Sequence, residues 1–404
     1  MSNLFQSATS GVYNLKKYYQ GPIVDQFSED TAIYRGAEKG KYSWSGEEVR
    51  RPLRIRRNPG IGATSDGGVL PAIGRQAGVQ AVIAAKYNYL RFGITGPMIK
   101  ASQNDKGSFV RQASHELEMG YKDLQSDINR QLSWDGTSDL ALLNAAAAAS
   151  TSIVVKGRET GEPALKFLDV GMCIDVYSSS TLVASGVNIT AISGTATAST
   201  ATLTLDTAVT VSSGDIVVRS GSFGNEVQGI LTQLDNGTST VFSIDRATYP
   251  ITQGNYLDLS GAQLTLDALQ QSWNLGKQRG GAKYAAIYSD YNALRFYQKL
   301  LTADKRYVNT QKGDGGFSSA SESYLEFNGT PWVADKDCPQ RIFMLPADVI
   351  EKYVLCEMEF ADETGTMYIA QTSADSFEVR VRHFLNLFNS QASASSVITG
   401  YVSP

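Results

Sequence analysis

Hydrophobic residues follow a helical period in one long segment of the chain. Seven apolar residues recur every three or four positions, which places them on one stripe of a helix: Val110, Ala113, Leu117, Tyr121, Leu124, Ile128 and Leu132. Six charged residues fall on the other side: Arg111, Glu118, Lys122, Asp123, Asp127 and Arg130. The pattern predicts a helix over residues 109–133 that ends near Gly136, because glycine suits a helix C-terminus. An alanine-rich segment, residues 140–149, predicts a second helix.

Alternating patterns predict strands on both sides of this helix. Residues 86–95 and 376–388 alternate apolar and polar side chains with a period of two, as half-exposed strands do. Residues 324–327 and 331–334 flank Asn328-Gly329, a strong signal for a β-hairpin.

The C-terminal half mixes further helices with these strands. Thr265 can cap a helix that stops at Gly280-Gly281, and Ser289 can cap the next one. A short apolar run at 342–345 predicts a strand, and Pro346 suits the first position of a following helix.

The composition changes at Thr151. Between Ser178 and Ser213, 17 of 36 residues are Ser or Thr, and Asp206 is the only charged one. Five short β-branched runs recur between turn residues, at 153–155, 172–176, 187–192, 202–205 and 216–218. This pattern predicts a small all-β module inserted between helical segments. We interpret its Ser/Thr content as β-propensity on a solvent-facing surface.

The first hundred residues show no sustained helical period and few strong strand runs. A long irregular segment is unusual inside a compact domain. Aromatic residues are nevertheless spread along it, and aromatic side chains need something to bury against: Tyr13, Tyr18, Tyr19, Phe27, Tyr34, Tyr42 and Trp44. An arm with aromatic anchors and no core of its own is expected to pack on other copies of the chain, which points to an assembly protein.

Length and composition narrow the class further. The 404 residues suit two or three domains at roughly 150 residues each. The net charge of −4 does not suit a protein that coats nucleic acid. No apolar run approaches the ~20 residues of a membrane helix, and the N-terminus does not resemble a secretory signal. Three distant cysteines, Cys173, Cys338 and Cys356, indicate reduced thiols and a cytoplasmic folding compartment.

Catalytic motifs are missing. The two histidines, His115 and His383, are interpreted as polar residues on the faces of a helix and a strand. The sequence contains no metal-binding motif, phosphate loop or nucleophile elbow. The glycine-rich residues 313–316 follow a polar stretch and are interpreted as a loop. We therefore expect no enzyme activity, no cofactor and no metal.

Two segments carry opposite charge. Residues 35–57 contain eight basic and three acidic residues, a net charge of +5, whereas residues 357–378 contain six acidic and no basic residues. Opposed patches on one chain suit self-association. The candidate interface residues are Arg50, Arg51, Arg54, Arg56, Arg57, Glu357, Glu359, Asp362 and Glu363. Two alternatives remain open: both patches are solvated and unrelated, or the arginines contact nucleic acid.

Several short strings, in order along the chain, resemble the major capsid proteins of tailed bacteriophages with the HK97-type fold. They are 229–231 (GIL), 243–250 (SIDRATYP), 279–281 (RGG), 325–331 (LEFNGTP) and 334–339 (ADKDCP). The resemblance implies an α+β, HK97-like capsid fold with an N-terminal arm, an extended loop, a long spine helix, peripheral and axial domains, and an inserted all-β domain.

The resemblance also implies a division of the chain. We expect an arm at 1–35, an extended loop at 36–90, a peripheral domain at 91–150 with its spine helix at about 108–134, and the inserted β-domain at 151–222. The peripheral domain continues at 223–255, the axial domain spans 256–375, and residues 376–404 return to the peripheral domain.

The function implied is that of a major capsid protein. Hexamers and pentamers would form an icosahedral head around double-stranded DNA, in the virion, after assembly in the host bacterial cytoplasm. Expected partners are other copies of the chain and scaffolding, portal and cement proteins, with non-specific DNA contact and no membrane. Some members cross-link a loop lysine to a neighbour, but nothing marks Lys39, Lys41 or Lys86 for this, so we expect a non-covalent shell.

Two rival classes remain. An encapsulin-type compartment shell protein would have the same fold but would bind cargo instead of phage partners. A trimeric phage adhesin or receptor-binding protein would explain the Ser/Thr-rich module, but it leaves the long helix and the arm unexplained.

Overall fold

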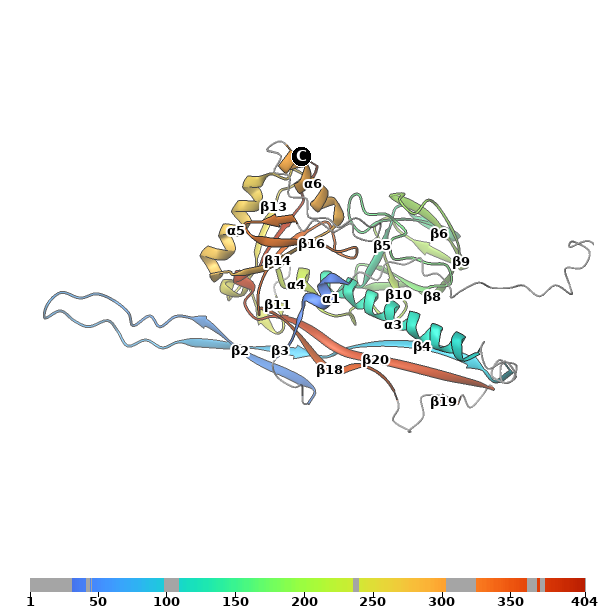
Figure 1. Cartoon of the computed structure of the whole chain (residues 1–404), viewed down its shortest axis with the longest axis horizontal. Helices are drawn as coiled ribbons and strands as arrows, with labels where there is room; N and C mark the ends of the chain where they lie inside the picture. The colour runs from blue at the N-terminus through green and yellow to red at the C-terminus, as the bar shows by residue number, and fades with distance from the viewer. Residues whose placement is uncertain are drawn as a thin grey trace, which may run out of the picture.

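The protein is an α+β chain in which a long sheet, a compact sheet with helices, a barrel and a projecting ribbon are distinct (Figure 1). The computed structural model describes residues 31–40, 44, 46–97, 109–234, 240–302, 325–361, 369, 370 and 375–403. Most of the predicted arm and the glycine-rich residues 313–316 lie outside the described residues.

The long sheet is organised by strand β20 (Ser376–Asn389). This strand pairs with β18 (Ile350–Phe360), with β4 (Lys86–Thr95) and with the short β19 (Ile369–Ala370), all antiparallel. Strand β1 (Glu38–Lys39) adds to the other edge of β18. The strands predicted at 86–95 and 376–388 are therefore confirmed, and the whole of β4 pairs with residues 376–385 of β20.

Helix α3 (Phe109–Ser133) lies over this sheet, as predicted (Figure 1). Of its apolar stripe, Leu124, Ile128 and Leu132 are buried against Leu385 and other core residues. Arg130, one of the charged residues on the other side of the helix, is also buried, with 1% of its surface exposed. The last turn of the helix is buried all round because other parts of the chain cover its polar side.

A buried ion-pair network surrounds Arg130. Its guanidinium contacts Glu226 at 2.5 Å and Asp127 at 3.2 Å, and Arg219 approaches Asp127 at 3.4 Å. Burial raises the pKa of Glu226. Burial also acts to raise the pKa of Asp127, but Arg130 and Arg219 outweigh it and lower that pKa. Because Arg219 ends strand β10 and Glu226 follows it, the network joins the long helix to the barrel.

The barrel is a closed sheet of six strands in the order β10-β5-β6-β9-β8-β7. Its strands are β5 (Asp139–Leu143), β6 (Ala147–Lys156), β7 (Cys173–Ser178), β8 (Thr181–Ser193), β9 (Thr200–Val211) and β10 (Ile216–Arg219). All five predicted β-branched runs coincide with its strands, except that Met172 lies one residue before β7. The helix predicted at 140–149 is wrong, because this segment forms β5 and begins β6. Closure of the barrel overrides the helical preference of its alanines.

The compact sheet has six strands in the order β13-β21-β17-β14-β16-β15. They are β13 (Asn255–Asp258), β21 (Ser396–Thr399), β17 (Ile342–Pro346), β14 (Tyr284–Ser289), β16 (Thr330–Ala334) and β15 (Leu325–Phe327). The hairpin predicted across Asn328-Gly329 is confirmed as β15–β16. The helix predicted after Pro346 is wrong, since the chain turns instead into strand β18.

Two helices accompany this sheet. Helix α5 (Leu266–Gly280) is capped by Thr265, whose hydroxyl accepts the Ala268 N–H, and it stops at Gly281 with φ of 65°. Helix α6 (Tyr291–Thr302) was also predicted, but its cap is Asp290 and not Ser289. The Asp290 carboxylate accepts the N–H groups of Asn292 and Ala293 at 3.1 Å.

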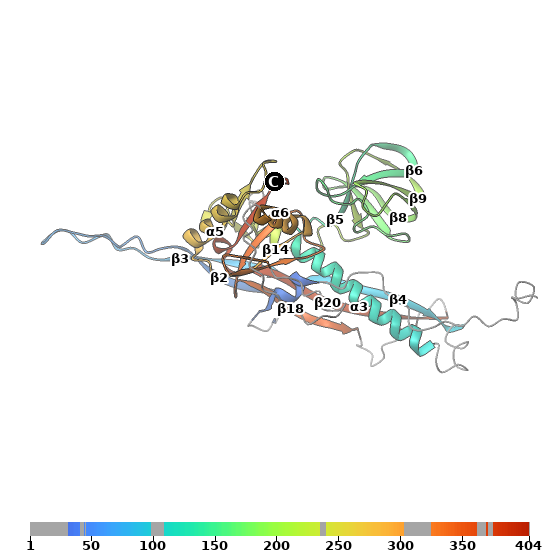
Figure 2. The ribbon, with the colours of Figure 1, turned by 45° about the horizontal axis from the view of Figure 1, so that its top comes forward.

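The ribbon is the antiparallel pair β2 (Glu48–Arg56) and β3 (Ala77–Ala84). In both views it extends away from the rest of the chain (Figures 1 and 2). The remaining elements are short: α1 (Ala32–Gly36), α4 (Ile230–Leu234), β11 (Thr240–Val241), β12 (Ile244–Asp245), η2 (Pro250–Thr252) and η3 (Ala392–Ala394).

The elements cross the division expected from the sequence at several places. Strand β5 and the first residues of β6, inside the expected peripheral segment 91–150, belong to the barrel. Strand β18, inside the expected axial segment 256–375, pairs with β20 in the long sheet. Strand β21, inside the expected peripheral segment 376–404, pairs with β13 and β17 in the compact sheet. The chain therefore passes between the two sheets more often than a linear division suggests.

The buried pair predicts an asymmetric mutational response. Replacing Arg130 by Met leaves the Glu226 carboxylate buried without its cation, so the free energy of unfolding should fall by about 3–5 kcal/mol. The double variant Arg130→Met/Glu226→Met removes both charges and should be clearly more stable than Arg130→Met alone. Urea denaturation of the three proteins measures this, and a double variant no more stable than the single one would contradict it.

A buried carboxyl predicts a pH dependence. Burial raises the pKa of Asp337 to about 6, although Asn129 Nδ2 donates a hydrogen bond to it at 2.8 Å. Since the folded-state pKa lies above the ordinary value, the native state binds this proton more tightly, and the stabilisation is lost as the pH rises through 6. Relative to Asp337→Asn, the wild-type free energy of unfolding should fall by up to about 3 kcal/mol between pH 4 and 7. If the free energy of unfolding changes with pH in the same way in both proteins, this role for Asp337 is ruled out.

Candidate assembly interface

The ribbon has no core of its own and is fixed at its root. A two-stranded hairpin alone is marginally stable in water. Here Ala81 and Ile83 of β3 are 0% exposed. They pack in a root cluster with Val241, Phe242, Ile244, Tyr353 and Phe388. The rings of Phe242 and Phe388 meet edge to face at 5.4 Å between centroids. The root is therefore anchored to β18 and β20, which sets the direction of the ribbon.

The tip of the ribbon is apolar and uncovered. Four aliphatic side chains between β2 and β3 are 79% to 104% exposed: Ile61, Val69, Leu70 and Ile73. Large exposed apolar surfaces are typical of sites that contact another molecule. The tip therefore has the character of a docking element.

Two of the five predicted arginines have partners within the chain. Arg50 pairs with Glu48 on its own strand at 2.6 Å, and Arg51 reaches Glu351 of β18 at 3.4 Å. The Arg51 pair ties the ribbon to the long sheet beside the root cluster. Because Arg50 is largely exposed, its pair contributes little to stability.

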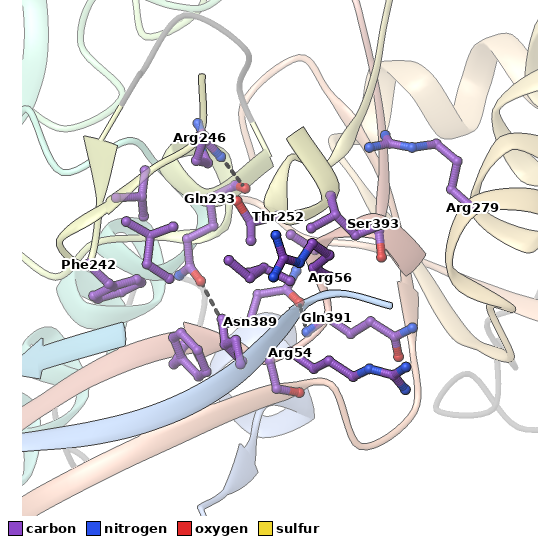
Figure 3. Close-up of a pocket in the computed structure, with 18 of the residues that line it drawn as sticks. Arg54, Arg56, Gln233, Phe242, Arg246, Thr252, Arg279, Asn389, Gln391 and Ser393 are labelled. Carbon is purple, nitrogen blue, oxygen red and sulfur yellow. Dashed lines mark hydrogen bonds between the residues drawn. The ribbon is translucent and has the colours of Figure 1, made fainter. Parts of the chain in front are cut away.

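The other three arginines, Arg54, Arg56 and Arg57, are exposed and line a cavity of about 520 Å³ at the ribbon root. Two arginines of the body, Arg246 and Arg279, line the same cavity (Figure 3). We call this cavity the arginine pocket. None of the described residues that line it is acidic.

Backbone carbonyls hold the two body arginines in place. Arg246 Nη1 donates to the Gln233 carbonyl at 2.7 Å, at the C-terminal end of α4. Arg279 donates to the Pro250, Gln253 and Gly254 carbonyls and to Asn255 Oδ1. Carbonyl oxygens satisfy the Arg279 donors without neutralising the charge, so this guanidinium adds positive potential to the pocket.

The charge pattern along the sequence does not reveal Arg246 and Arg279, because each is isolated from the cluster at 50–57. Both arginines do lie in the short strings that resemble capsid proteins. Arg246 lies in 243–250, and Arg279 begins 279–281. Only the fold places them beside Arg54 and Arg56, roughly 200 residues earlier in the sequence.

The predicted acidic residues lie along the end of β18. Glu357 and Glu359 are exposed on this strand, whereas Asp362 and Glu363 lie outside the described residues. Glu359 contacts Arg382 of β20 at 3.0 Å, and Cys356 Sγ donates to it at 3.2 Å. Glu357 and Glu359 do not line the arginine pocket of their own chain.

The structure also places the histidine and the cysteines that could carry other chemistry. His383 is 1% exposed, with Nδ1 at 2.9 Å from the Cys356 carbonyl and Nε2 at 3.3 Å from the Tyr34 hydroxyl. Burial lowers the pKa of His383. All three cysteines are free thiols. In the part of the chain that the structure describes, no cluster of three or more His, Cys, Asp or Glu could hold a metal ion, and no helix could span a membrane.

Comparison with known proteins identifies the fold. Neither a family model nor a curated protein sequence matches the chain. A chain of the cyanophage A-1(L) capsid asymmetric unit matches with a TM-score of 0.64 at 12% identity, covering 98% of this chain and 99% of that one. A chain from the capsid of a native GTA particle matches with a TM-score of 0.56 at 9% identity, covering 99% and 100%. The chain therefore has the α+β fold of these capsid proteins, and the fold expected from the sequence is confirmed.

The root cluster predicts how the ribbon can be loosened. Replacing Phe388 by Ala removes a ring that is 2% exposed, and the cavity should cost about 3–5 kcal/mol of stability. The loss should be concentrated at the root, so amide exchange in β2 and β3 should accelerate more than exchange in the barrel strand β9. Equal acceleration in the ribbon and the barrel would contradict the anchoring role.

Proposed function

We propose that the protein is a non-enzymatic major capsid subunit that self-assembles into a closed shell. The observation that carries this proposal is a ribbon with an apolar tip and an arginine-lined root, which cannot bury these surfaces within its own chain. The likeness of the whole chain to capsid proteins supports self-assembly into an oligomeric shell.

The assembly mechanism follows from the ribbon. It lies over a neighbouring copy, where the tip residues Ile61, Val69, Leu70 and Ile73 lose contact with water. Burial of a large aliphatic side chain contributes roughly 1.5–3 kcal/mol. The ribbon arginines Arg50, Arg51, Arg54, Arg56 and Arg57 face the neighbour's acidic residues Glu357, Glu359, Asp362 and Glu363. The apolar tip supplies affinity, and the charges supply register and orientation.

The finer proposal concerns the particle. Hexamers and pentamers close an icosahedral head around double-stranded DNA, and the protein resides in the virion after assembly in the bacterial host cytoplasm. Separate scaffolding, portal and cement proteins are the proposed partners, and contact with packaged DNA is non-specific. The inserted barrel stands beside the long helix as an accessory domain of the subunit.

The proposal is tested by expressing the chain with and without the scaffolding gene of its phage, followed by negative-stain electron microscopy. Closed shells or capsomer rings are the expected products. A uniform trimer or monomer under both conditions would overturn the proposal and favour an adhesin. Shells that load a protein cargo and exclude DNA would favour a compartment protein.

The ribbon arginines provide a specific prediction. The double variant Arg54→Glu/Arg56→Glu should block shell formation while the subunit stays folded, because both side chains are exposed and their replacement leaves the root cluster intact. Electron microscopy reports assembly, and circular dichroism with urea denaturation reports folding. Normal shells from this variant would refute the docking role of these two arginines.

A further inference from the structure

The barrel and the rest of the chain have separate apolar cores. The barrel core is built from residues between positions 140 and 217, and the core cluster around helix α3 contains none of them. Two connectors join the parts: residues 134–138 between α3 and β5, and residues 220–229 between β10 and α4. Figure 2 shows the barrel as a separate body beside α3. Contacts between the two bodies are therefore made mainly by polar groups.

The two connectors lie side by side and form a pivot. Ser138 Oγ of the first connector donates to the Ser222 carbonyl of the second at 2.7 Å. Glu226 of the second connector is paired with Arg130 of α3. Four residues of the connectors have positive φ: Gly136, Ser138, Gly221 and Gly224. Short irregular segments at the ends of elements absorb the change in backbone angles when a domain turns.

A second contact holds the barrel from the side of the compact sheet. The segment between β6 and β7, residues 157–172, packs into the barrel core through Leu168. From this segment Glu159 contacts Arg341 Nη1 at 2.7 Å and accepts the Gln340 N–H at 2.7 Å. We call this contact the latch. Because the latch is polar and lies apart from the pivot, the barrel can turn only when the latch opens.

A stacked arginine lies between the barrel and the body beside the latch. The Arg158 guanidinium lies 3.9 Å from the centroid of the Trp134 ring and 4.4 Å from that of the Phe167 ring. Trp134 belongs to the core around α3, whereas Phe167 packs against the barrel core. The Arg158 side chain is 1% exposed, and cation–π attraction is strongest where water is excluded. The docked position therefore depends on a desolvated layer of charge.

One carboxyl in this layer lacks a cation. Four others lie within 3.2 Å of an arginine: Asp127, Glu159, Glu162 and Glu226. Asp139, the first residue of β5, makes no such pair among the described residues, and its Oδ1 has no hydrogen-bond partner there. A buried charge without a partner is costly. The docked barrel therefore favours the neutral, protonated form of Asp139.

The groups that face Asp139 act in the same direction on balance. Burial is the largest cause that raises the pKa of Asp139 to about 6, and the nearby carboxylates of Asp135 and Glu226 add to it. A hydrogen bond from Thr137 and the charge of Arg158 act to lower this pKa, but burial outweighs them. Asp139 thus changes charge near neutral pH.

The latch carboxyl responds to pH in the same sense. Burial raises the pKa of Glu159, and neighbouring Glu162 adds to this, against the effects of Arg341, Gln340 and Arg158. Both folded-state pKa values lie above the ordinary ones, so the docked state binds these protons more tightly than an open, hydrated state would. Docking is therefore strongest in mild acid and weakens as the pH rises through about 6.

We propose that the barrel is a hinged domain with a proton-dependent latch. It is docked on α3 when Asp139 is protonated, and it turns about the two connectors when Asp139 is ionised. Turning hydrates the Asp139 carboxylate and separates Glu159 from Arg341, while the Arg130–Glu226 pair stays at the pivot. The inference concerns the single subunit, so it holds or fails independently of the proposed shell.

The test is hydrogen–deuterium exchange of the full, unassembled chain at about pH 5 and about pH 7.5, expressed as protection factors. The Gln340 amide reports the latch, because its hydrogen bond to Glu159 joins the body to the barrel segment. Its protection should fall roughly tenfold between the two pH values, as a docked-state pKa of about 6 requires against an ordinary 3.8. The amides of barrel strand β9 should keep their protection, because the barrel turns as a folded unit.

Three variants separate this device from general effects of pH. Asp139→Asn keeps the shape but cannot ionise, so protection at Gln340 should change by less than about threefold. Asp206→Asn is the matched control, because this barrel carboxylate is exposed and bonds to Asn188 away from the connectors; it should respond to pH as wild type does. Arg158→Met removes the stacked cation and should lower the Gln340 protection at both pH values.

The contrary outcomes are equally specific. Gln340 protection that does not change with pH in wild type, or that falls as far in folded Asp139→Asn, would overturn the hinge. Loss of protection in β9 together with Gln340 would mean that the barrel unfolds instead of turning, which also overturns it. If Asp139→Asn does not fold by circular dichroism, Arg158→Met decides, and unchanged Gln340 protection in that variant refutes the latch. Shell formation is measured separately and bears only on the proposed function.

Discussion

The ribbon has no core of its own, and the functional surfaces of the molecule follow from this constraint. Its root is stable because Ile83 packs with Phe242, Tyr353 and Phe388 of the body. Its tip has no such support and leaves four aliphatic side chains in solvent. A two-stranded projection of this kind gains stability only when another surface covers it. The root cluster therefore fixes the ribbon where it begins, and in the proposed assembly a neighbouring copy provides the burial that the tip lacks.

Strand β20 connects this root to the rest of the fold. Its first half pairs with β4 beneath helix α3, and its second half pairs with β18 and contributes Phe388 to the root cluster. The same strand also bears Arg382, which holds Glu359 of β18 in the isolated subunit. A force applied to the ribbon would thus be passed directly to the long sheet and its helix. This arrangement suits a subunit whose neighbours pull on it through the ribbon.

Charge has two different roles in the molecule. Around Arg130 it is buried and balanced, with Glu226 and Asp127 in direct contact, and it fixes the barrel to the helix. In the arginine pocket five guanidiniums line one cavity, and none of the described lining residues is acidic. Breaking a buried pair by removing one partner is costly, whereas a cavity at the surface that is lined by cations can receive an anion. The first arrangement is structural, and the second is suited to recognition.

Elements whose side chains keep one period over many residues can be predicted from the sequence alone. The long helix and the strands at 86–95 and 376–388 could be predicted because one face of each is apolar over its length. The other features depend on tertiary contacts. Arg130 is buried because the barrel and neighbouring segments cover a polar helix face, and residues 140–149 form strands because the barrel closes through them. The arginines at 50–57 could be recognised as a charged cluster, but their pocket could not, because Arg246 and Arg279 reach it only through the fold. Local periodicity records which face of an element is apolar, whereas burial of a polar residue and the meeting of distant charges depend on contacts far apart in sequence.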